Sequence, residues 1–364
     1  MHEAADSELL VRDLSKTFNG HVALDRCSLS LKKGEVVALL GPSGCGKSTL
    51  LNLIAGFEQP DFGTIALRGK SIAKVPPHRR NVAMVFQNYA LFPHMTAAEN
   101  IAYGLKARKV GKAEWQERVA RAAGLLKLTG LEGRYPAELS GGQRQRVAVA
   151  RAIAIDPEIL LLDEAFSALD RNLRDQTQLE LSLLLRRLAI TTVLVTHDQQ
   201  EAFALSDRIA VMRGGRIEQV GPPDEVYRAP VNSFVLGFMG RANDLPAILA
   251  TTPEGRIARI GEGIAFPLAA TTAAPPDGPV AVHIRSEDLM VSPVPTRVHA
   301  SHPASVVLSM SLGARQRIVL GYGDDLQIVL EVPASAITDP SILYQNAPAF
   351  IDFDPASAIV DGVR

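Results

Sequence analysis

The sequence predicts an α/β domain built on a parallel sheet, followed by a smaller all-β domain. Short apolar runs alternate with segments of helical periodicity, which is typical of parallel strands joined by crossover helices. The runs lie at residues 36–40, 82–86, 159–162, 192–196 and 209–212. After about residue 240, proline and glycine become frequent and the apolar runs become short, which indicates a barrel-like β module. We therefore place the two domains at residues 1–240 and 241–364.

A glycine-rich loop with a lysine follows the first of these strands. It consists of Gly41, Pro42, Ser43, Gly44, Cys45, Gly46, Lys47, Ser48 and Thr49. Strand, glycine-rich turn and helix are the context in which this spacing forms a phosphate-binding loop. Backbone amides and the positive end of the helix dipole attract an anion there. Lys47 would reach the β- and γ-phosphates and Ser48 would ligate Mg²⁺, so we expect the chain to bind a nucleoside triphosphate.

The remaining elements follow in order. Residues 9–33 alternate apolar and polar side chains between turn signals, which predicts short antiparallel strands. Helical spacing from Thr96 onward predicts a helical subdomain at about residues 90–157, in which Trp115, Val119, Ala122 and Leu126 form a core-facing stripe. A leucine-rich helix at 173–188 and a hairpin at 209–220 complete the first domain. Strands are expected in the second domain at 280–284, 304–309, 316–320, 326–332 and 349–353.

Two carboxylates stand at the end of the strand expected at residues 159–162. Asp163 would hold Mg²⁺, and Glu164 would be free to act as a general base toward water. The alternative is a strand that merely ends in surface acids, which the phosphate loop disfavours.

A second anion-binding loop precedes the helix expected at residues 143–154. Ser140, Gly141, Gly142 and Gln143 stand at the start of that helix, where backbone amides are free. Two phosphate sites in one chain make sense if the loop of one copy completes the site of another.

The composition limits the other function classes. The formal net charge is −1, so no bulk attraction to nucleic acid or anionic membrane is expected. Two cysteines, Cys27 and Cys45, give neither a disulfide framework nor a metal cluster, and they fit a reducing cytoplasm. The first residues lack the layout of a signal peptide. Since no window approaches about 18 consecutive apolar residues, work at a membrane would require docking to another chain.

On these motifs the chain resembles the ATP-binding subunit of an ATP-binding-cassette (ABC) transporter. Residues 139–143 match the signature loop of that family, and the resemblance covers nearly the whole chain. It implies a RecA-like parallel sheet with an N-terminal antiparallel part and the helical subdomain. It also implies a C-terminal transport-associated domain with an OB-like fold, which residues 280–291 resemble, although Ser286 stands where the family commonly has proline.

The resemblance implies further site residues. Phe18 would stack on adenine, with a plain core aromatic as the alternative. Gln87 would sense Mg²⁺ and the attacking water, and residues 88–94 would contact a transmembrane partner. Asp170 would communicate across a dimer, and His197 would contact the γ-phosphate.

The resemblance also implies partners. Two copies would close face to face, with each ATP between residues 41–49 of one copy and 140–143 of the other. Two transmembrane permease subunits and, indirectly, a solute-binding protein would complete an importer. The subunit would lie peripherally on the cytoplasmic face of a bacterial inner membrane, without a nucleic-acid partner.

The transported substrate is less constrained. Residues 196–202, 216–221 and 243–245 resemble spermidine/putrescine-type subunits, which favours a polyamine. Ferric-iron, sugar, sulfate and phosphonate importers share nearly the same motifs, and an ABC ATPase unconnected with transport is a more remote alternative.

Three local features depart from the family pattern or add to it. Ala165 stands where proline is common, and we expect a small effect on the acidic turn. Cys45 lies inside the phosphate loop, so its modification should block nucleotide binding. Arg144, Arg146 and Arg151 are expected to form a solvated helix face.

Overall fold

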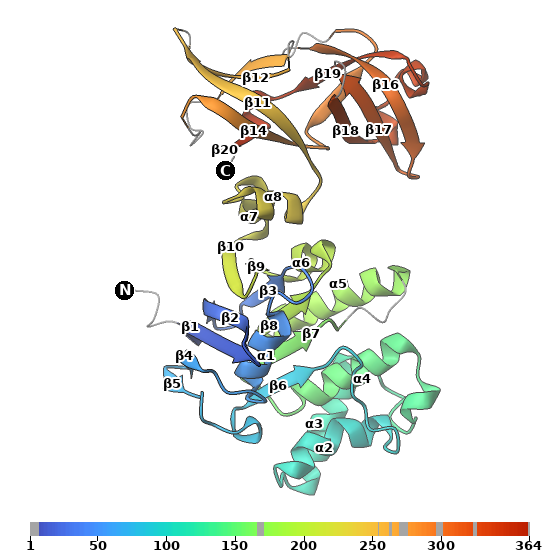
Figure 1. Cartoon of the computed structure of the whole chain (residues 1–364). Coiled ribbons are helices and arrows are strands. Elements are labelled where there is room, and N and C mark those ends of the chain that lie inside the picture. The colour runs from blue at the N-terminus through green and yellow to red at the C-terminus, as the bar shows by residue number, and fades with distance from the viewer. Residues whose placement is uncertain are drawn as a thin grey trace. The chain divides into compact units, whose positions relative to one another are not determined.

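The computed structural model describes residues 7–165, 171–253, 255–261, 264–268, 276–295, 301–322 and 326–362. The chain divides into two compact units, residues 1–229 and 230–364, which are described separately (Figure 1). This division falls earlier than the expected boundary after residue 240, so that the short helix α8 (Ser233–Met239) is grouped with the second unit. No helix of the described ranges is both long and apolar enough to cross a membrane.

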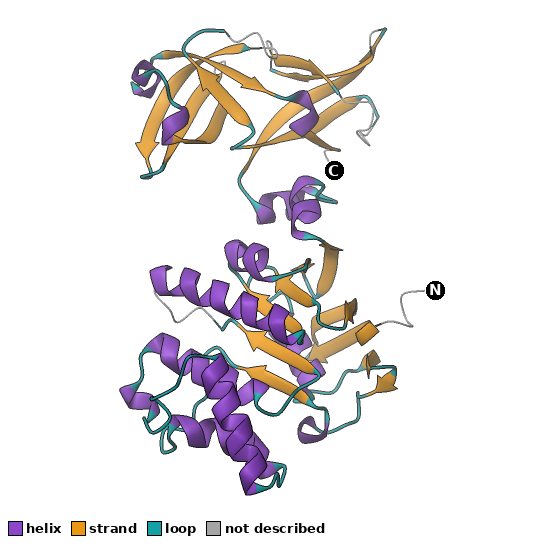
Figure 2. Ribbon diagram, turned by 180° about the vertical axis from the view of Figure 1, so that it is seen from behind, coloured by secondary structure: helices purple, strands orange, loops and turns teal. Residues whose placement is uncertain are grey.

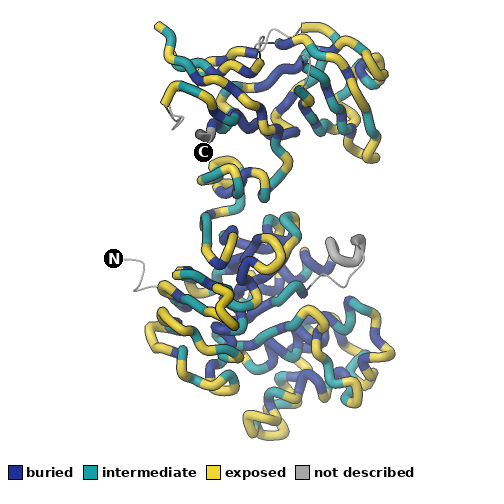
Figure 3. The backbone as a smooth tube through the Cα atoms, in the orientation of Figure 1, coloured by how far each residue is buried: buried dark blue, intermediate teal, exposed yellow. Residues whose placement is uncertain are grey.

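A six-stranded sheet forms the centre of the first unit, in the order β10-β9-β3-β8-β7-β6. The strands are β3 (Val36–Leu40), β6 (Val82–Val85), β7 (Ile159–Asp163), β8 (Thr191–Thr196), β9 (Arg208–Arg213) and β10 (Arg216–Gly221). All neighbours are parallel except the hairpin β9–β10. Every residue of β3 and β8 is buried, as expected for central strands of a parallel sheet (Figure 3). The sequence of β3 is continuously apolar, whereas β8 buries three threonines around its apolar centre. The predicted parallel sheet is confirmed.

A second, antiparallel sheet precedes and flanks the first. Its order is β2-β1-β4-β5, formed by β1 (Ser7–Phe18), β2 (His21–Lys32), β4 (Phe62–Leu67) and β5 (Lys70–Ser71). Helix α1 (Lys47–Ala55) packs against strands of both sheets, and one hydrophobic core joins all three parts. This core fixes the end of β3, from which the glycine-rich loop departs.

The helical part of the first unit contains α2 (Ala97–Ala107), α3 (Lys112–Leu125) and α4 (Gly141–Ile153), which lie together beside β6 in Figure 1. Of the predicted core stripe, Val119, Ala122 and Leu126 are buried. Trp115 is only half-buried and lies under the ammonium group of Lys106, 4.7 Å from the ring centroid. The Trp115 ring therefore forms a cation–π contact with Lys106 of α2 and is not part of the buried core.

The connections complete this unit. Helix α5 (Arg171–Leu188) joins β7 to β8, as predicted for a crossover helix, and α6 (Gln199–Leu205) follows β8. Helix α7 (Pro223–Arg228) ends the unit, and two single 3₁₀ turns lie at Pro77–Arg79 and Pro136–Glu138.

The second unit is almost entirely β-structure (Figure 2). One sheet has the order β13-β12-β11-β14-β20, and the other β15-β19-β16-β17-β18. Their strands are β11 (Ala242–Thr252), β12 (Gly255–Ile260), β13 (Ile264–Pro267), β14 (Gly278–Arg285), β20 (Ile359–Gly362), β15 (Leu289–Ser292), β16 (His302–Ser311), β17 (Arg315–Tyr322), β18 (Leu326–Pro333) and β19 (Pro348–Phe353). Both sheets share one core. The all-β prediction is confirmed, and the structure adds β11, β12, β13, β15 and β20 to the predicted strands.

Candidate active site

The glycine-rich loop joins the buried end of β3 to the first turn of α1. Its crest, Pro42 to Gly44, and the Ser48 side chain are exposed, whereas Gly41, Cys45 and Gly46 are buried beneath them. Gly46 is the N-cap of α1 and has a φ of +107°. The loop thus presents backbone amides at the positive end of a helix, the arrangement that binds phosphate.

Close contacts explain the glycines at the base of the loop. A Cβ atom on Gly46 would lie 2.5 Å from the carbonyl oxygen of Ala23, and one on Gly41 would lie 2.4 Å from that of Met212. Gly44 also has a positive φ, of +79°, but faces open space. The base of the loop is therefore fixed by contacts with β2 and β9, while the crest is fixed by conformation alone.

The variant Gly46→Ala is expected to lose roughly 2 kcal/mol or more of the free energy of unfolding, because it combines a left-handed conformation with a backbone clash. Gly44→Ala is the matched control, since it adds only the conformational cost of about 1 kcal/mol. Urea unfolding of the two variants measures the difference. Equal losses in both variants would contradict the steric account of Gly46.

Lys47 lies back over the loop that precedes it. Its Nζ donates to the carbonyl oxygens of Gly41 and Pro42, at 2.6 and 3.0 Å, and the residue is 7% exposed. A buried ammonium held by carbonyl groups is oriented before any anion arrives. Lys47 is thus positioned at the crest, where the sequence predicted a phosphate.

Asp163, the last residue of β7, lies next to the first turn of α1. Burial raises the pKa of this carboxyl group, and the charge of Glu164 raises it further, whereas a hydrogen bond with Ser48 and the charge of Lys47 act in the opposite direction. A hydroxyl and a partly desolvated carboxylate in contact are oxygen donors of the kind that Mg²⁺ prefers. The predicted pair Ser48 and Asp163 is therefore brought together.

Glu164 occupies a strained backbone position. Its φ is +45°, a left-handed value that is unusual for a residue other than glycine, and its amide donates to the carbonyl oxygen of Val195 at 3.0 Å. Such outliers are often found at functional sites, where neighbouring structure enforces them. Here the neighbouring strand β8 holds the turn, and the buried Ala165 follows it.

Two predicted residues, Gln87 and His197, converge on the Glu164 carboxylate from the ends of the strands on either side of β7. Gln87, after β6, donates from Nε2 to one carboxylate oxygen at 3.1 Å. His197, after β8, brings Nδ1 to 3.4 Å from the other oxygen. Since β6, β7 and β8 are parallel, their carboxyl ends share one edge of the sheet. This edge therefore gathers an acid or base, an amide and an imidazole.

A short network supports the histidine. The Thr196 hydroxyl donates to Glu201 at 2.5 Å and accepts from the amide of Asp198, whose carboxylate caps helix α6. Asp198 and Glu201 entered the sequence analysis only through the resemblance of residues 196–202 to spermidine/putrescine-type subunits, and the hydrogen bonds of this network were not predicted. The signal was present, because an aspartate three residues before a glutamate at the start of a helix resembles a capping box.

Ser140 lies on the helical part of the unit. It is exposed, it is the N-cap of α4, and it forms a capping box with Gln143, whose amide donates to Ser140 Oγ at 3.3 Å. The predicted helix N-terminus is thus present. It belongs to a helix that packs on α2, α3 and α5, whereas the glycine-rich loop packs on β2 and β9.

Phe18 ends β1 and is 38% exposed, with the ammonium group of Lys16 5.0 Å from its ring centroid. An exposed ring does not fit the alternative of a core aromatic. Its partner across the turn is His21, at the start of the strand whose Ala23 contacts Gly46. Asp170 lies outside the described residues.

Two further expectations change. Cys45 is 4% exposed and belongs to the hydrophobic core, so reagents in solution reach its thiol poorly.

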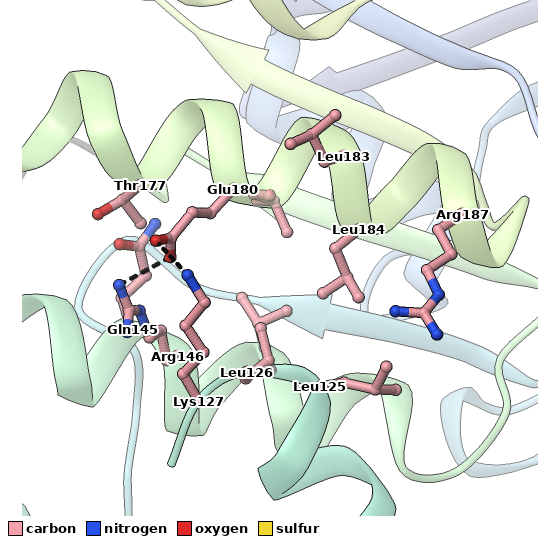
Figure 4. Close-up of a pocket in the computed structure, with 12 residues that line it drawn as sticks. Leu125, Leu126, Lys127, Gln145, Arg146, Thr177, Glu180, Leu183, Leu184 and Arg187 are labelled. Atoms are coloured by element: carbon pink, nitrogen blue, oxygen red, sulfur yellow. Dashed lines mark hydrogen bonds and ion pairs between the residues drawn. The ribbon is translucent and has the colours of Figure 1, made fainter.

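The prediction that Arg144, Arg146 and Arg151 form a solvated helix face is wrong, because all three arginines have protein partners. Arg144 donates to the carbonyl oxygen of Leu139, and Arg146 pairs with Glu180 at 2.8 Å, as Figure 4 shows beside Lys127. Arg151 binds the segment that follows Gln87.

Comparisons with known proteins identify the family of this chain. The family model described as ABC transporter matches residues 24–167. A spermidine/putrescine import ATP-binding protein of Acidothermus cellulolyticus is 43% identical, over 96% of this chain and 89% of that protein. A sulfate/thiosulfate import ATP-binding protein of Chromobacterium violaceum is 50% identical, over 78% of this chain and 76% of that protein.

A solved structure of an ATP-binding cassette has a similar fold. It is described as the dimer of a post-hydrolysis state bound to ADP and Pi. It is 31% identical with a TM-score of 0.54, and the match covers 59% of this chain and 98% of that one. The chain therefore belongs to the ABC transporter family, among the ATP-hydrolysing, ATP-binding subunits of importers.

Proposed function

We propose that this ATPase drives the uptake of a polyamine through separate transmembrane subunits, and that two copies enclose two ATP molecules. The observation that carries the ATPase part is the convergence of Gln87 and His197 on the Glu164 carboxylate, beside the pair Ser48 and Asp163.

The triphosphate binds along the loop from Gly41 to Thr49. Exposed amides at the crest and the N-terminus of α1 contact the phosphate oxygens, and Lys47 turns from its carbonyl partners to the β- and γ-phosphates. Phe18, exposed at the end of β1, stacks on the adenine ring.

Ser48 and Asp163 would hold Mg²⁺, with Gln87 nearby. The metal supplies positive charge that neutralises the phosphates. Desolvation of Asp163 disfavours its charged form, so a cation at this place relieves an unfavourable burial.

Glu164 accepts a proton from the attacking water. The left-handed backbone at Glu164 and the contacts of Gln87 and His197 hold its carboxylate in one orientation, which is what a general base needs. His197, more than half exposed, is free to contact the γ-phosphate as well.

The second copy supplies Ser140 to Gln143 to the triphosphate. Ser140 is exposed at the N-terminus of a thirteen-residue helix, which favours contact with an anion. Closure around ATP then changes the positions of the transmembrane subunits, because ATP binds the closed state better than the open one. We expect the subunit to associate peripherally with the cytoplasmic face of the membrane through those permease subunits.

The polyamine assignment rests on the extent of similarity. One spermidine/putrescine relative aligns with 96% of this chain, including the second unit, while two others align with 79% and 68% and the sulfate relative aligns with 78%. We assign the second unit a regulatory or dimer-supporting role, in line with its resemblance to a transport-associated domain. Sulfate is the alternative substrate, because the sulfate/thiosulfate relative is 50% identical to this chain.

Deletion of the gene is expected to abolish uptake of labelled spermidine and putrescine and to leave sulfate uptake unchanged. Restoring the wild-type chain should restore uptake, and Lys47→Ala, which lacks the phosphate-binding cation, should lower it at least about 100-fold. Loss of sulfate uptake alone would contradict the polyamine assignment. Full uptake with Lys47→Ala would contradict the requirement for ATP.

A further inference from the structure

The segment that follows Gln87 has an unusual backbone. Tyr89 and Ala90 have φ values of +63° and +44°, so two consecutive residues with side chains adopt the left-handed conformation. Residues other than glycine rarely do so without support from outside the segment. Something must therefore hold this backbone in place.

Arg151 of helix α4 provides that support. Its Nη2 donates to the carbonyl oxygen of Tyr89 and its Nη1 to that of Ala90, each at 2.8 Å. Its guanidinium group also lies 5.7 Å from the ring centroid of Phe92. A planar fork with two parallel donors fits two consecutive carbonyl groups, which a lysine ammonium cannot match.

A second residue holds the far end of the same segment. Asn100 of α2 is fully buried, accepts from the amide of Phe92 at 2.8 Å, and donates to the carbonyl oxygens of Phe92 and Met95. Asn100 ties the segment to α2. Arg151 alone of these two residues ties it to the helix that begins after Ser140.

Helix α4 is well suited to transmit a displacement. It runs from Gly141 to Ile153, and its residues 147–150 are all buried against neighbouring elements. A buried helix moves as one body, so a shift at Ser140 reaches Arg151. Arg151 in turn binds the carbonyl groups of residues 89 and 90. These residues follow Gln87, whose side chain contacts Glu164.

We propose that Arg151 is a positioning residue that couples the two half-sites of one chain, the Ser140 loop and the Gln87–Glu164 pair. The coupling rests on the proposed function, in which Ser140 contacts the ATP held by the second copy. Binding of ATP to that copy then sets the position of Gln87 in this one. The rate of hydrolysis then depends cooperatively on the ATP concentration, because ATP bound at one half-site changes the geometry of the other.

The test compares three full-length variants with the wild type. Arg151→Met removes both hydrogen bonds, and Arg151→Lys keeps the charge with a single donor group. Arg146→Met is the matched control, since Arg146 lies on the same helix but pairs with Glu180 of α5. One measurement is amide hydrogen exchange at Tyr89 and Phe92, and the other is the ATPase rate as a function of ATP concentration.

For Arg151→Met we expect exchange at these amides to rise roughly tenfold, because their segment loses its support. The Hill coefficient should fall from above 1 in the wild type to about 1, with less than about a twofold change in the KM for ATP. Arg151→Lys should give intermediate values in both measurements, and Arg146→Met should match the wild type.

Three outcomes would overturn the proposal. Unchanged exchange in Arg151→Met would mean that the arginine does not hold the segment. Raised exchange with an unchanged Hill coefficient would mean that it holds the segment without coupling the half-sites. The same changes in Arg146→Met would make them general effects of loosening α4. A wild-type chain without ATPase activity would instead contradict the proposed function, and the exchange measurement would still decide whether Arg151 holds the segment.

Discussion

Glu164→Gln is expected to bind ATP as the wild type does and to hydrolyse it roughly 10²–10⁴-fold more slowly. The amide has nearly the shape of the carboxylate and keeps an oxygen for the hydrogen bond from Gln87. It cannot accept a proton from water at neutral pH, so the triphosphate persists. We therefore also expect an ATP-bound dimer to accumulate, because closure is no longer reversed by hydrolysis.

Steady-state hydrolysis, equilibrium ATP binding and size-exclusion chromatography with and without Mg-ATP measure these three effects. Glu117→Gln is the matched control, since Glu117 is exposed on α3, away from this edge of the sheet. Hydrolysis by Glu164→Gln at the wild-type rate would remove Glu164 from the role of base.

Ser140→Arg is expected to reduce turnover at least about 100-fold, which is the effect of losing a transition-state contact, while the monomer keeps its affinity for ATP. A long cation at the exposed N-terminus of α4 obstructs close approach to a second copy and opposes the helix dipole. The glycine-rich loop of the same chain is untouched, since it packs on β2 and β9.

Ser140→Ala separates the cap from the bulk of the new side chain. It removes the hydrogen bond to the amide of Gln143 and should cost about 1 kcal/mol of stability, with a much smaller effect on turnover. Thermal unfolding of both variants checks that α4 still forms. Lost ATP binding in a folded Ser140→Arg monomer would mean that the loop acts on the site of its own chain.

The first unit was largely predictable from sequence because its signals are local. Buried parallel strands such as residues 36–40 read as uninterrupted apolar runs, and glycine, lysine and serine at fixed spacing mark the loop after β3. The carboxylates at the end of β7 were identified for the same reason. Their distances to Gln87 and His197 were not predictable, because they depend on the register of three strands.

Other features were missed because their cause is distant or ambiguous. Arg151 reads as a surface residue in sequence, since its two carbonyl partners lie about sixty positions earlier in the chain. Strand β11 contains Pro246, and proline usually argues against a strand. The left-handed backbone of Glu164 had no signal at all, because glutamate gives no sign of that conformation.

The conformation of Glu164 has a consequence for the evolution and engineering of this protein. Glycine adopts a φ of +45° with little strain, so selection for heat resistance alone would favour Glu164→Gly over the native carboxylate. At this edge of the sheet, thermal stability and catalytic turnover therefore favour different residues. Attempts to stabilise this chain should leave position 164 unchanged.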